Sequence, residues 1–512
     1  MKKYLLLLVL ILTACSKVPS LSGPKPIQNK EGKLTYFTTL RENIRTTYGT
    51  YSETPLAKHL FEVMGIDVEY IHPNSQSTIS VLNVFIASGT VPDIIEFTWN
   101  NYPGGPEKAM DDGVVLPLND YIQAYAPNYS RYLTENPDIV KMVTTQSDRH
   151  YGFPLIREDE SLYTFMGPFI REDWLSKLSL PIPETISDWE AVLTAFKNEL
   201  NVPIPFSTDI YEYDVTGAFC GAFGVVPGFY VEDGIVKHGA LSDGYFEFLQ
   251  LFRRWYENGL LDPNFGRREV SYIPDIMLEG KLGSTVQTAG STMGKIQELA
   301  IAAGDNEFHL VGTPYPVLNR GERPKFGHTS FPVISTAISA ASNNKELACK
   351  FLDFGYSDEG KLVYNFGIPD ESYTMVDGHP KYTDVILNNP DYPVNVAMSF
   401  YIKSNDQGPF IQMKDYLTQY YKTPELKQAL SLWLETDAVK HIIPEIGFSA
   451  KDSLATYDSL TQLDTYTKDK LVRFVMGLDD LETYPEFRAE MEVRTRELLA
   501  IYQQSYDKYM SR

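Results

Sequence analysis

The sequence predicts an α/β fold in which each sheet is mainly parallel and flanked by helices. Near the N-terminus, short strands alternate with amphipathic helices of about 10–15 residues, which is the pattern of βαβ units. The length of 512 residues suits two to four domains or two large lobes. With 43% hydrophobic and 22% charged residues, the composition is that of a globular chain with an ample core.

The N-terminal part carries the clearest alternation. Apolar periodicity predicts a strand at 34–39, a helix at 54–65, a strand at 68–71, a helix at 75–88 and a strand at 93–98. The first of these helices ends at Gly65, a residue suited to a helix C-cap. In parallel sheets ligands bind beyond the carboxyl ends of the strands, so the residues that follow the third strand lie where a site is expected.

The rest of the chain continues this pattern and becomes helical towards its end. Residues 187–200 are predicted to form a helix with a capping box between Ser187 and Glu190. Further predictions are helices at 243–258 and 344–354, a short strand at 283–286, and mostly helices from Pro424 onward.

The N-terminus has the features of an exported lipoprotein. A basic start, Met1 to Lys3, precedes an apolar run from Leu5 to Leu12 that is too short for a bilayer but suits a signal peptide. The sequence Leu-Thr-Ala-Cys that ends at Cys15 resembles the bacterial lipoprotein box, which predicts cleavage before Cys15 and acylation of this residue. The alternative is an ordinary signal peptide cut elsewhere. Residues 16–33, rich in Ser, Pro, Gly and Lys, are predicted to form a flexible tether.

Charge excludes some classes of partner. The net charge is −22, from 45 basic and 67 acidic residues. Such a chain repels nucleic acid and an anionic membrane surface, so no nucleic acid partner is predicted and membrane attachment has to come from lipid. Cys220 and Cys349 lie in apolar stretches and are predicted to be buried, unpaired thiols, although a disulfide is allowed outside the cytoplasm.

The sequence carries no signature of an enzyme. It contains no HExxH, CxxC, DxDxDG or GxSxG motif, and its eight histidines are scattered. We therefore predict no catalytic residues, no metal and no cofactor. Acidic runs such as 157–160 and 171–173 are typical of solvated surface. A surface glycoside hydrolase that uses two of these carboxylates stays open as an alternative.

One aromatic segment stands out from the rest. Aromatic residues make up 13% of the chain, and most of them are expected in the core. Trp99, Asn100, Asn101 and Tyr102 place two rings and two amides directly after a predicted strand. Aromatic faces stack on the C–H-rich faces of sugar rings, and amides bind their hydroxyls. The alternative is a rigid loop pinned by the Pro-Gly-Gly that follows.

Long segments of the chain resemble bacterial carbohydrate-transport proteins. PDIIEFTWNNYPGGPEKAMDDGVVLPLNDYI (92–122), GPFIREDWLSKL (167–178) and LFRRWYENGLLDPNF (251–265), together with the lipoprotein box, resemble the substrate-binding lipoproteins of carbohydrate ABC transporters, the family 1 extracellular solute-binding proteins. The resemblance continues at 350–367, 408–421 and 503–512 and covers nearly the whole mature chain. Segments 278–296 and 338–352 are similar to maltose-binding protein, a distant member of this family.

The resemblance implies a two-lobed fold like that of periplasmic binding proteins, with a hinge and a helical C-terminal part. The signal peptide would occupy 1–14 and the lipidated cysteine and tether 15–33. The first lobe would then comprise 34–153 and 308–370, and the second lobe 154–307 and 371–512.

The resemblance also implies two ligand-binding loops, one on each lobe. The candidate binding residues are Phe97, Trp99, Asn100, Asn101 and Tyr102 in the first loop and Gln287 and Ser291 in the second. Maltose-binding protein has an aromatic residue in the second loop, where this chain has Ala289, Gly290 and Ser291, so maltodextrin is not the predicted ligand.

The predicted function is that of a non-enzymatic receptor. A monomer, lipid-anchored on the extracytoplasmic face of the cell membrane, would bind a sugar or oligosaccharide between its lobes and deliver it to the permease of an ABC importer. A peptide ligand, or a membrane sensor as the partner, fits the same fold and stays open.

Overall fold

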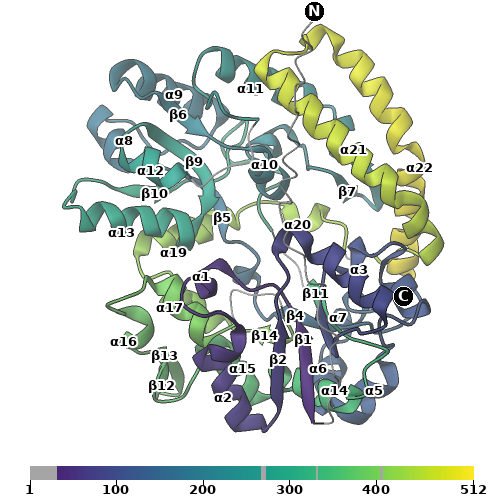
Figure 1. Ribbon diagram of the computed structural model, residues 1–512. Coiled ribbons are helices and arrows are strands. Elements are labelled where there is room, and N and C mark those ends of the chain that lie inside the picture. The colour runs from purple at the N-terminus through teal and green to yellow at the C-terminus, as the bar shows by residue number, and fades with distance from the viewer. Residues whose placement is uncertain (1–31, 267–271, 330–332, 404–407, 445) are drawn as a thin grey trace, which may run out of the picture.

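The computed structural model describes residues 32–266, 272–329, 333–403, 408–444 and 446–512, and it divides into two lobes built on separate sheets (Figure 1). The predicted two-lobed architecture is therefore confirmed. Cys15 and the predicted signal peptide lie outside the described residues, as does nearly all of the predicted tether. None of the helices in the described ranges is long and apolar enough to cross a membrane.

The first lobe is built on a six-stranded sheet in the order β14-β4-β11-β3-β1-β2. Strand β1 pairs in parallel with β2 and β3, and β14 pairs in parallel with β4, whereas β11 runs antiparallel to both of its neighbours. The strands are β1(Lys33–Phe37), β2(Asp67–Ile71), β3(Ile94–Glu96), β4(Phe153–Arg157), β11(Val333–Ile338) and β14(Phe410–Gln412).

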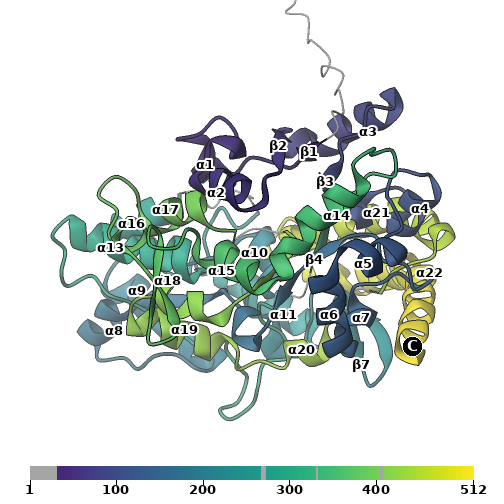
Figure 2. The same ribbon diagram turned by 90° about the horizontal axis from the view of Figure 1, so that it is seen from below.

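Helices of the first lobe pack on this sheet, and Figure 2 shows α5, α6 and α14 side by side. They are α1(Glu42–Arg45), α2(Pro55–Met64), α3(Thr78–Ser88), α4(Gly105–Asp111), α5(Asn119–Tyr125), α6(Pro127–Glu135), α7(Pro137–Met142), α14(Lys345–Asp353) and α15(Asp358–Phe366). Helix α2 follows the sequence prediction closely. Thr54 caps its first turn by accepting a hydrogen bond from the Ala57 N–H at 3.2 Å, and Gly65 ends it in the left-handed region at φ 67°.

The second lobe is built on a four-stranded sheet in the order β10-β5-β9-β6. Only β6 and β9 pair in parallel, whereas β5 pairs antiparallel with both β9 and β10, so this sheet is mixed and not mainly parallel. A strand that enters from the other lobe needs no crossover helix and can pair antiparallel. The strands are β5(Met166–Arg171), β6(Ile204–Ser207), β9(Leu282–Thr288) and β10(Leu310–Gly312).

The second lobe also holds a hairpin and the long C-terminal helices at the upper right of Figure 1. The hairpin is β7(Phe229–Glu232) and β8(Ile235–His238). The helices are α8(Glu172–Leu178), α9(Ile186–Glu199), α10(Ile210–Thr216), α11(Tyr245–Glu257), α12(Ile273–Leu278), α13(Lys295–Ala302), α21(Ala450–Met476) and α22(Tyr484–Ser511). The capping box of α9 lies two residues earlier than predicted, because Thr185 and Asp188, and not Ser187 and Glu190, exchange side chain–backbone hydrogen bonds at 3.0 and 3.1 Å.

A group of short elements packs against parts of both lobes. They are β12(Tyr373–Val376), β13(His379–Tyr382), α16(Asp384–Leu387), α17(Val394–Tyr401), α18(Leu417–Tyr420), α19(Pro424–Trp433) and α20(Ala438–His441). Met398 and Trp433 from this group share a core cluster with Phe169 and Leu310 of the second sheet. Helix α17 also packs against α1 and α2 of the first lobe.

Three strands depart from the predicted lobe boundaries. Strand β4 spans the boundary predicted at 153/154 and belongs wholly to the first sheet. Strand β10 lies within 308–370, predicted for the first lobe, but joins the second sheet, and β14 lies within 371–512, predicted for the second lobe, but joins the first sheet. Local periodicity shows that a strand forms, but not which sheet it pairs with.

The two thiols agree with the sequence prediction. Cys220 and Cys349 are both free and buried. Burial raises the pKa of the Cys349 thiol to about 12.

Gly167 of β5 lies against Trp433, and this close packing predicts the effect of adding a methyl group. A Cβ atom at Gly167 would overlap the indole ring of Trp433. We expect Gly167→Ala to lower the free energy of unfolding by roughly 1–3 kcal/mol, measured by urea denaturation. The control is Gly49→Ala, whose Cβ would meet nothing closer than 3.6 Å. Equal stability of the two variants would contradict the prediction.

The ion pairs of Glu232, on β7, should make the stability of the fold depend on pH. Its ion pairs with Lys237, at 2.5 Å, and with Lys325 lower the pKa of Glu232 from 4.5 to about 2. A carboxyl with a depressed folded-state pKa stabilises the fold above its unfolded pKa and loses this effect as the pH falls. Glu232→Gln should therefore melt below the wild type at neutral pH, with the difference shrinking between about pH 4.5 and 2. Thermal melting against pH measures this, with the exposed Glu247→Gln as control. A difference that stays constant down to low pH would be inconsistent with this role.

Candidate ligand-binding site

The predicted first loop follows β3 as a short helical turn, η3(Trp99–Asn101). Trp99 is 1% exposed and Phe97 8%, and their rings meet edge to face at 5.4 Å in the core of the first lobe. Asn100 and Asn101 are exposed, and the half-buried Tyr102 donates a hydrogen bond to Asp112 at 3.0 Å. Trp99 therefore exposes no ring face on which a sugar could stack, because the turn folds the indole back onto Phe97.

This loop borders the second lobe. Asn100, Pro106 and Thr145 of the first lobe and Ile446 and Gly447 of the second line a small cavity of about 20 Å³. A cavity of this size holds about one water molecule. The two lobes are therefore in close contact here, and of the predicted residues in this first loop Asn100, Asn101 and Tyr102 offer polar groups near the surface.

The predicted second loop follows β9, and its residues are engaged with the protein. Gln287 is 6% exposed, and its side-chain amide donates a hydrogen bond to Glu212 at the start of α10. Burial, and then the neighbouring Asp209, raise the pKa of Glu212 well above its ordinary value. Ser291 is exposed, and its hydroxyl lies 2.5 Å from that of Thr288.

A larger pocket opens beside this second loop. Its volume is about 260 Å³, and it lies between the turn 290–294, α13 and the start of β10 on one side and the start of α17 with residues 420–426 on the other. Gly290, next to Ser291, lines it, and a Cβ atom at Gly290 would overlap Tyr420. Helix α17, which supplies part of the lining, also packs against α1 and α2 of the first lobe.

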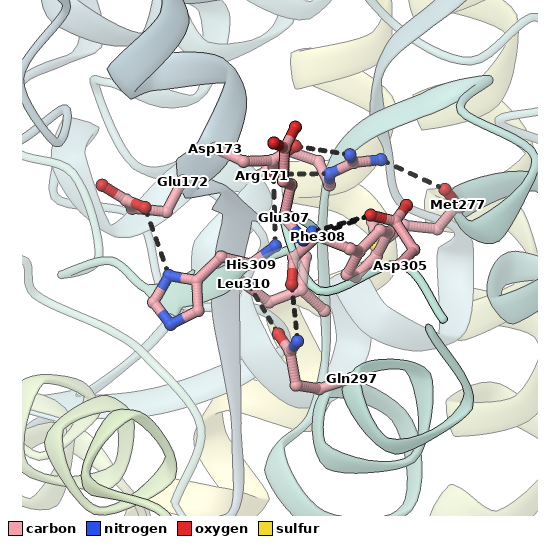
Figure 3. A network of polar contacts seen from close by, with 10 residues as sticks. All are labelled: Arg171, Glu172, Asp173, Met277, Gln297, Asp305, Glu307, Phe308, His309 and Leu310. Atoms are coloured by element: carbon pink, nitrogen blue, oxygen red, sulfur yellow. Dashed lines mark hydrogen bonds and ion pairs between the residues drawn. The ribbon is translucent and has the colours of Figure 1, made fainter. Parts of the chain in front are cut away.

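A polar network surrounds Gln297, His309 and Leu310, three of the residues that line this pocket (Figure 3). Gln297 holds the chain on both sides of His309, donating to the Phe308 carbonyl at 2.6 Å and accepting from the Leu310 N–H at 2.9 Å. His309 lies 3.2 Å from Glu172 and 3.6 Å from Glu425.

In the same network, the guanidinium of Arg171 pairs with Asp173 at 2.6 Å. It also lies over the rings of Trp174 and Phe308, at 4.2 and 4.0 Å from their centres. The segment 305–310 is thus held by Gln297 and Arg171, and it brings His309 to the edge of the pocket.

The side chains that line this pocket were not predicted from the sequence. Gln297, His309 and the segment that holds Tyr420 and Glu425 are far apart in the sequence, and no motif connects them. Of the predicted residues, those of the first loop lie together, and Gln287 and Ser291 lie together on the other lobe. Within the residues that the structure describes, no group of three or more His, Cys, Asp or Glu side chains is arranged to hold a metal ion.

Known proteins share both sequence and fold with this chain. It is 24% identical over 460 residues to lipoprotein LipO of Bacillus subtilis, covering 83% of each chain. It is 30% identical over 234 residues to the fructooligosaccharide ABC transporter substrate-binding protein FusA of Streptococcus pneumoniae, which is 41% of this chain and 42% of FusA.

Solved structures of other proteins superpose on this chain over nearly its whole length. The alginate-binding protein AlgQ2 without calcium superposes with a TM-score of 0.75 at 24% identity, covering 93% of this chain and 98% of AlgQ2. FusA in complex with kestose superposes with a TM-score of 0.73 at 21% identity, covering 94% of this chain and 99% of FusA. These likenesses establish the two-lobed fold.

The family match agrees with the sequence resemblance and with both lobes of the structure. The model of the bacterial extracellular solute-binding proteins matches residues 46–362, which is more than half of the chain and includes strands of both sheets. The chain therefore belongs to the family of bacterial extracellular solute-binding proteins.

Proposed function

We propose that this protein is a receptor for a sugar or oligosaccharide that serves an ABC importer. The observation that carries the proposal is the pocket of about 260 Å³ next to the second predicted loop, part of whose lining comes from α17, a helix that also packs against the first lobe. A ligand held between two lobes stabilises their closed arrangement, which a permease can distinguish from the empty receptor. The ligand class is supported by FusA, which is named for fructooligosaccharides, and by AlgQ2, which is named for alginate.

The lining of the pocket suits a hydroxylated ligand. Asn395, Gln297 and Tyr420 supply neutral donors and acceptors, and Met293, Ile301 and Leu426 supply apolar surface. On the first lobe, Asn100, Asn101 and Tyr102 remain candidate contacts for a ligand that extends between the lobes. In this role the protein binds its ligand and releases it without turnover.

The proposed setting is the extracytoplasmic face of the cell membrane. The lipoprotein box at Cys15 and the similarity to a protein named lipoprotein LipO support two proposals: a signal peptide is removed, and the chain is then anchored by lipid. The partner is the transmembrane permease of the importer, and the receptor acts as a monomer.

Thermal melting with a panel of ligands tests the proposal. The chain from Lys17 onward is melted with kestose, alginate oligosaccharides, milk oligosaccharides and short peptides. A ligand that binds only the folded state adds about 2.7 kcal/mol at a hundredfold excess over its Kd, which shifts the melting temperature by a few degrees. We expect this shift with one class of oligosaccharide, and no consumption of it. A shift with peptides alone would refute the ligand class.

A bulky substitution in the pocket tests its position. Val394 lines the pocket at the start of α17, and Val394→Trp fills part of it. We expect the affinity for the oligosaccharide found above to fall at least about tenfold, or 1.4 kcal/mol, by calorimetry. The control is Val376→Trp, on the exposed hairpin β12–β13, where the side chain is 46% exposed. Equal affinity of both variants would place the ligand elsewhere.

A further inference from the structure

A second cavity lies within the second lobe, and it shares no lining residue with the pocket beside the second predicted loop. Its volume is about 280 Å³, and its lining comes from α10, the surroundings of the β7–β8 hairpin, α21 and α22. Figure 1 shows α10 and β7 beside these two long helices. All of these elements contribute to one lobe, so a molecule in this cavity would be held without any movement of the lobes.

One side of the cavity carries an ion-pair triad. The ammonium of Lys468 lies 2.6 Å from Asp214 and 2.8 Å from Asp464. Burial lowers the pKa of Lys468, but the two carboxylates outweigh it and the pKa is raised, so the side chain stays charged. Because the ammonium of Lys468 already pairs with both carboxylates, a ligand does not have to be charged in order to bind here.

His238 supplies a hydrogen-bond donor to the same cavity. It is 5% exposed, and its Nδ1 accepts a hydrogen bond from the Ala240 N–H at 3.3 Å, at the start of η6(Gly239–Leu241). Burial lowers the pKa of His238 to about 4, so the ring is neutral at pH 7 and carries its proton on Nε2. Among the residues described, Nε2 has no hydrogen-bond partner, and His238 lines the cavity.

Aromatic and aliphatic side chains form the other side. Phe229 stacks on Tyr502 at 4.2 Å, and the ring of His238 meets Phe229 edge to face at 4.9 Å. Leu460 and Leu463 of α21 extend this apolar surface. The cavity thus combines an apolar wall with separate donors and acceptors.

We propose that this cavity is a second binding site, for a neutral polyhydroxylated molecule of the size of a single sugar ring. Hydroxyl groups can accept from His238 Nε2 and Lys468 and donate to Asp464, while the C–H face of the ring packs on the apolar wall. Small-molecule pockets span about 300–1,000 Å³, so the cavity suits a small occupant. Such a site would respond to monosaccharides independently of the oligosaccharide bound between the lobes.

Histidine NMR on the full mature chain tests this site. The protein is labelled at histidine Cε1, the His238 signal is assigned with His238→Gln, and D-glucose, D-galactose and D-fructose are titrated in turn. We expect one of them to shift the His238 signal saturably. Asp464 is 58% exposed, so Asp464→Ala leaves the fold intact, as its melting temperature will verify. Loss of a hydrogen bond to this charged group should weaken binding at least about tenfold.

The matched control is Asp458→Ala, an exposed carboxylate earlier on α21 that does not line the cavity. It should bind like the wild type. An equal Kd for Asp464→Ala and the wild type would overturn the inference. So would an unmoved His238 signal, even if an oligosaccharide raises the melting temperature and the proposed receptor function stands. A His238 response without any oligosaccharide stabilisation would instead uphold this site and refute the receptor function.

Discussion

The docking of Trp433 onto the second sheet is the interaction on which the position of α19 and of the pocket wall next to it depends. Its indole N–H donates to the carbonyls of Pro168 and Thr313, both at 3.1 Å, and its ring covers Gly167. These contacts tie α19 to β5 and β10 far from it in sequence. The start of α19 and residues 420–426 in turn form one wall of the pocket beside the second predicted loop. A buried indole that satisfies its single donor fixes both the position and the rotation of the helix that carries it.

Local features of the fold could be predicted from the sequence. Helix α2 and strands β1 to β3 appear close to their predicted positions because periodicity, a Thr N-cap and a Gly C-cap act over neighbouring residues. Which strand joins which sheet could not be predicted from the sequence. Leu155 of β4 lies opposite Val333 and Phe410, and nothing in the sequence near Leu155 specifies partners so distant.

In the candidate site, too, neighbouring residues in the sequence could be predicted to lie together, whereas contacts between distant segments could not. The residues 97–102 lie together because they are contiguous, but whether the Trp99 ring faces ligand or core depends on how the whole lobe packs, and it faces the core. Gln287 was predicted as a ligand contact, yet it is paired with Glu212, a partner on another element. The pocket beside the second predicted loop draws on α13, β10, α17 and α19, and only the three-dimensional structure brings these together.

The separation of the two thiols has a consequence for how the protein is made and how it moves. Cys220 belongs to the core of the second lobe and Cys349 to that of the first. Buried thiols with raised pKa values react slowly, since the thiolate is the reactive species. Folding of the two lobes therefore needs no oxidant or disulfide-exchange partner, because both of these thiols stay unpaired. No covalent link between Cys220 and Cys349 limits how far one lobe can swing from the other.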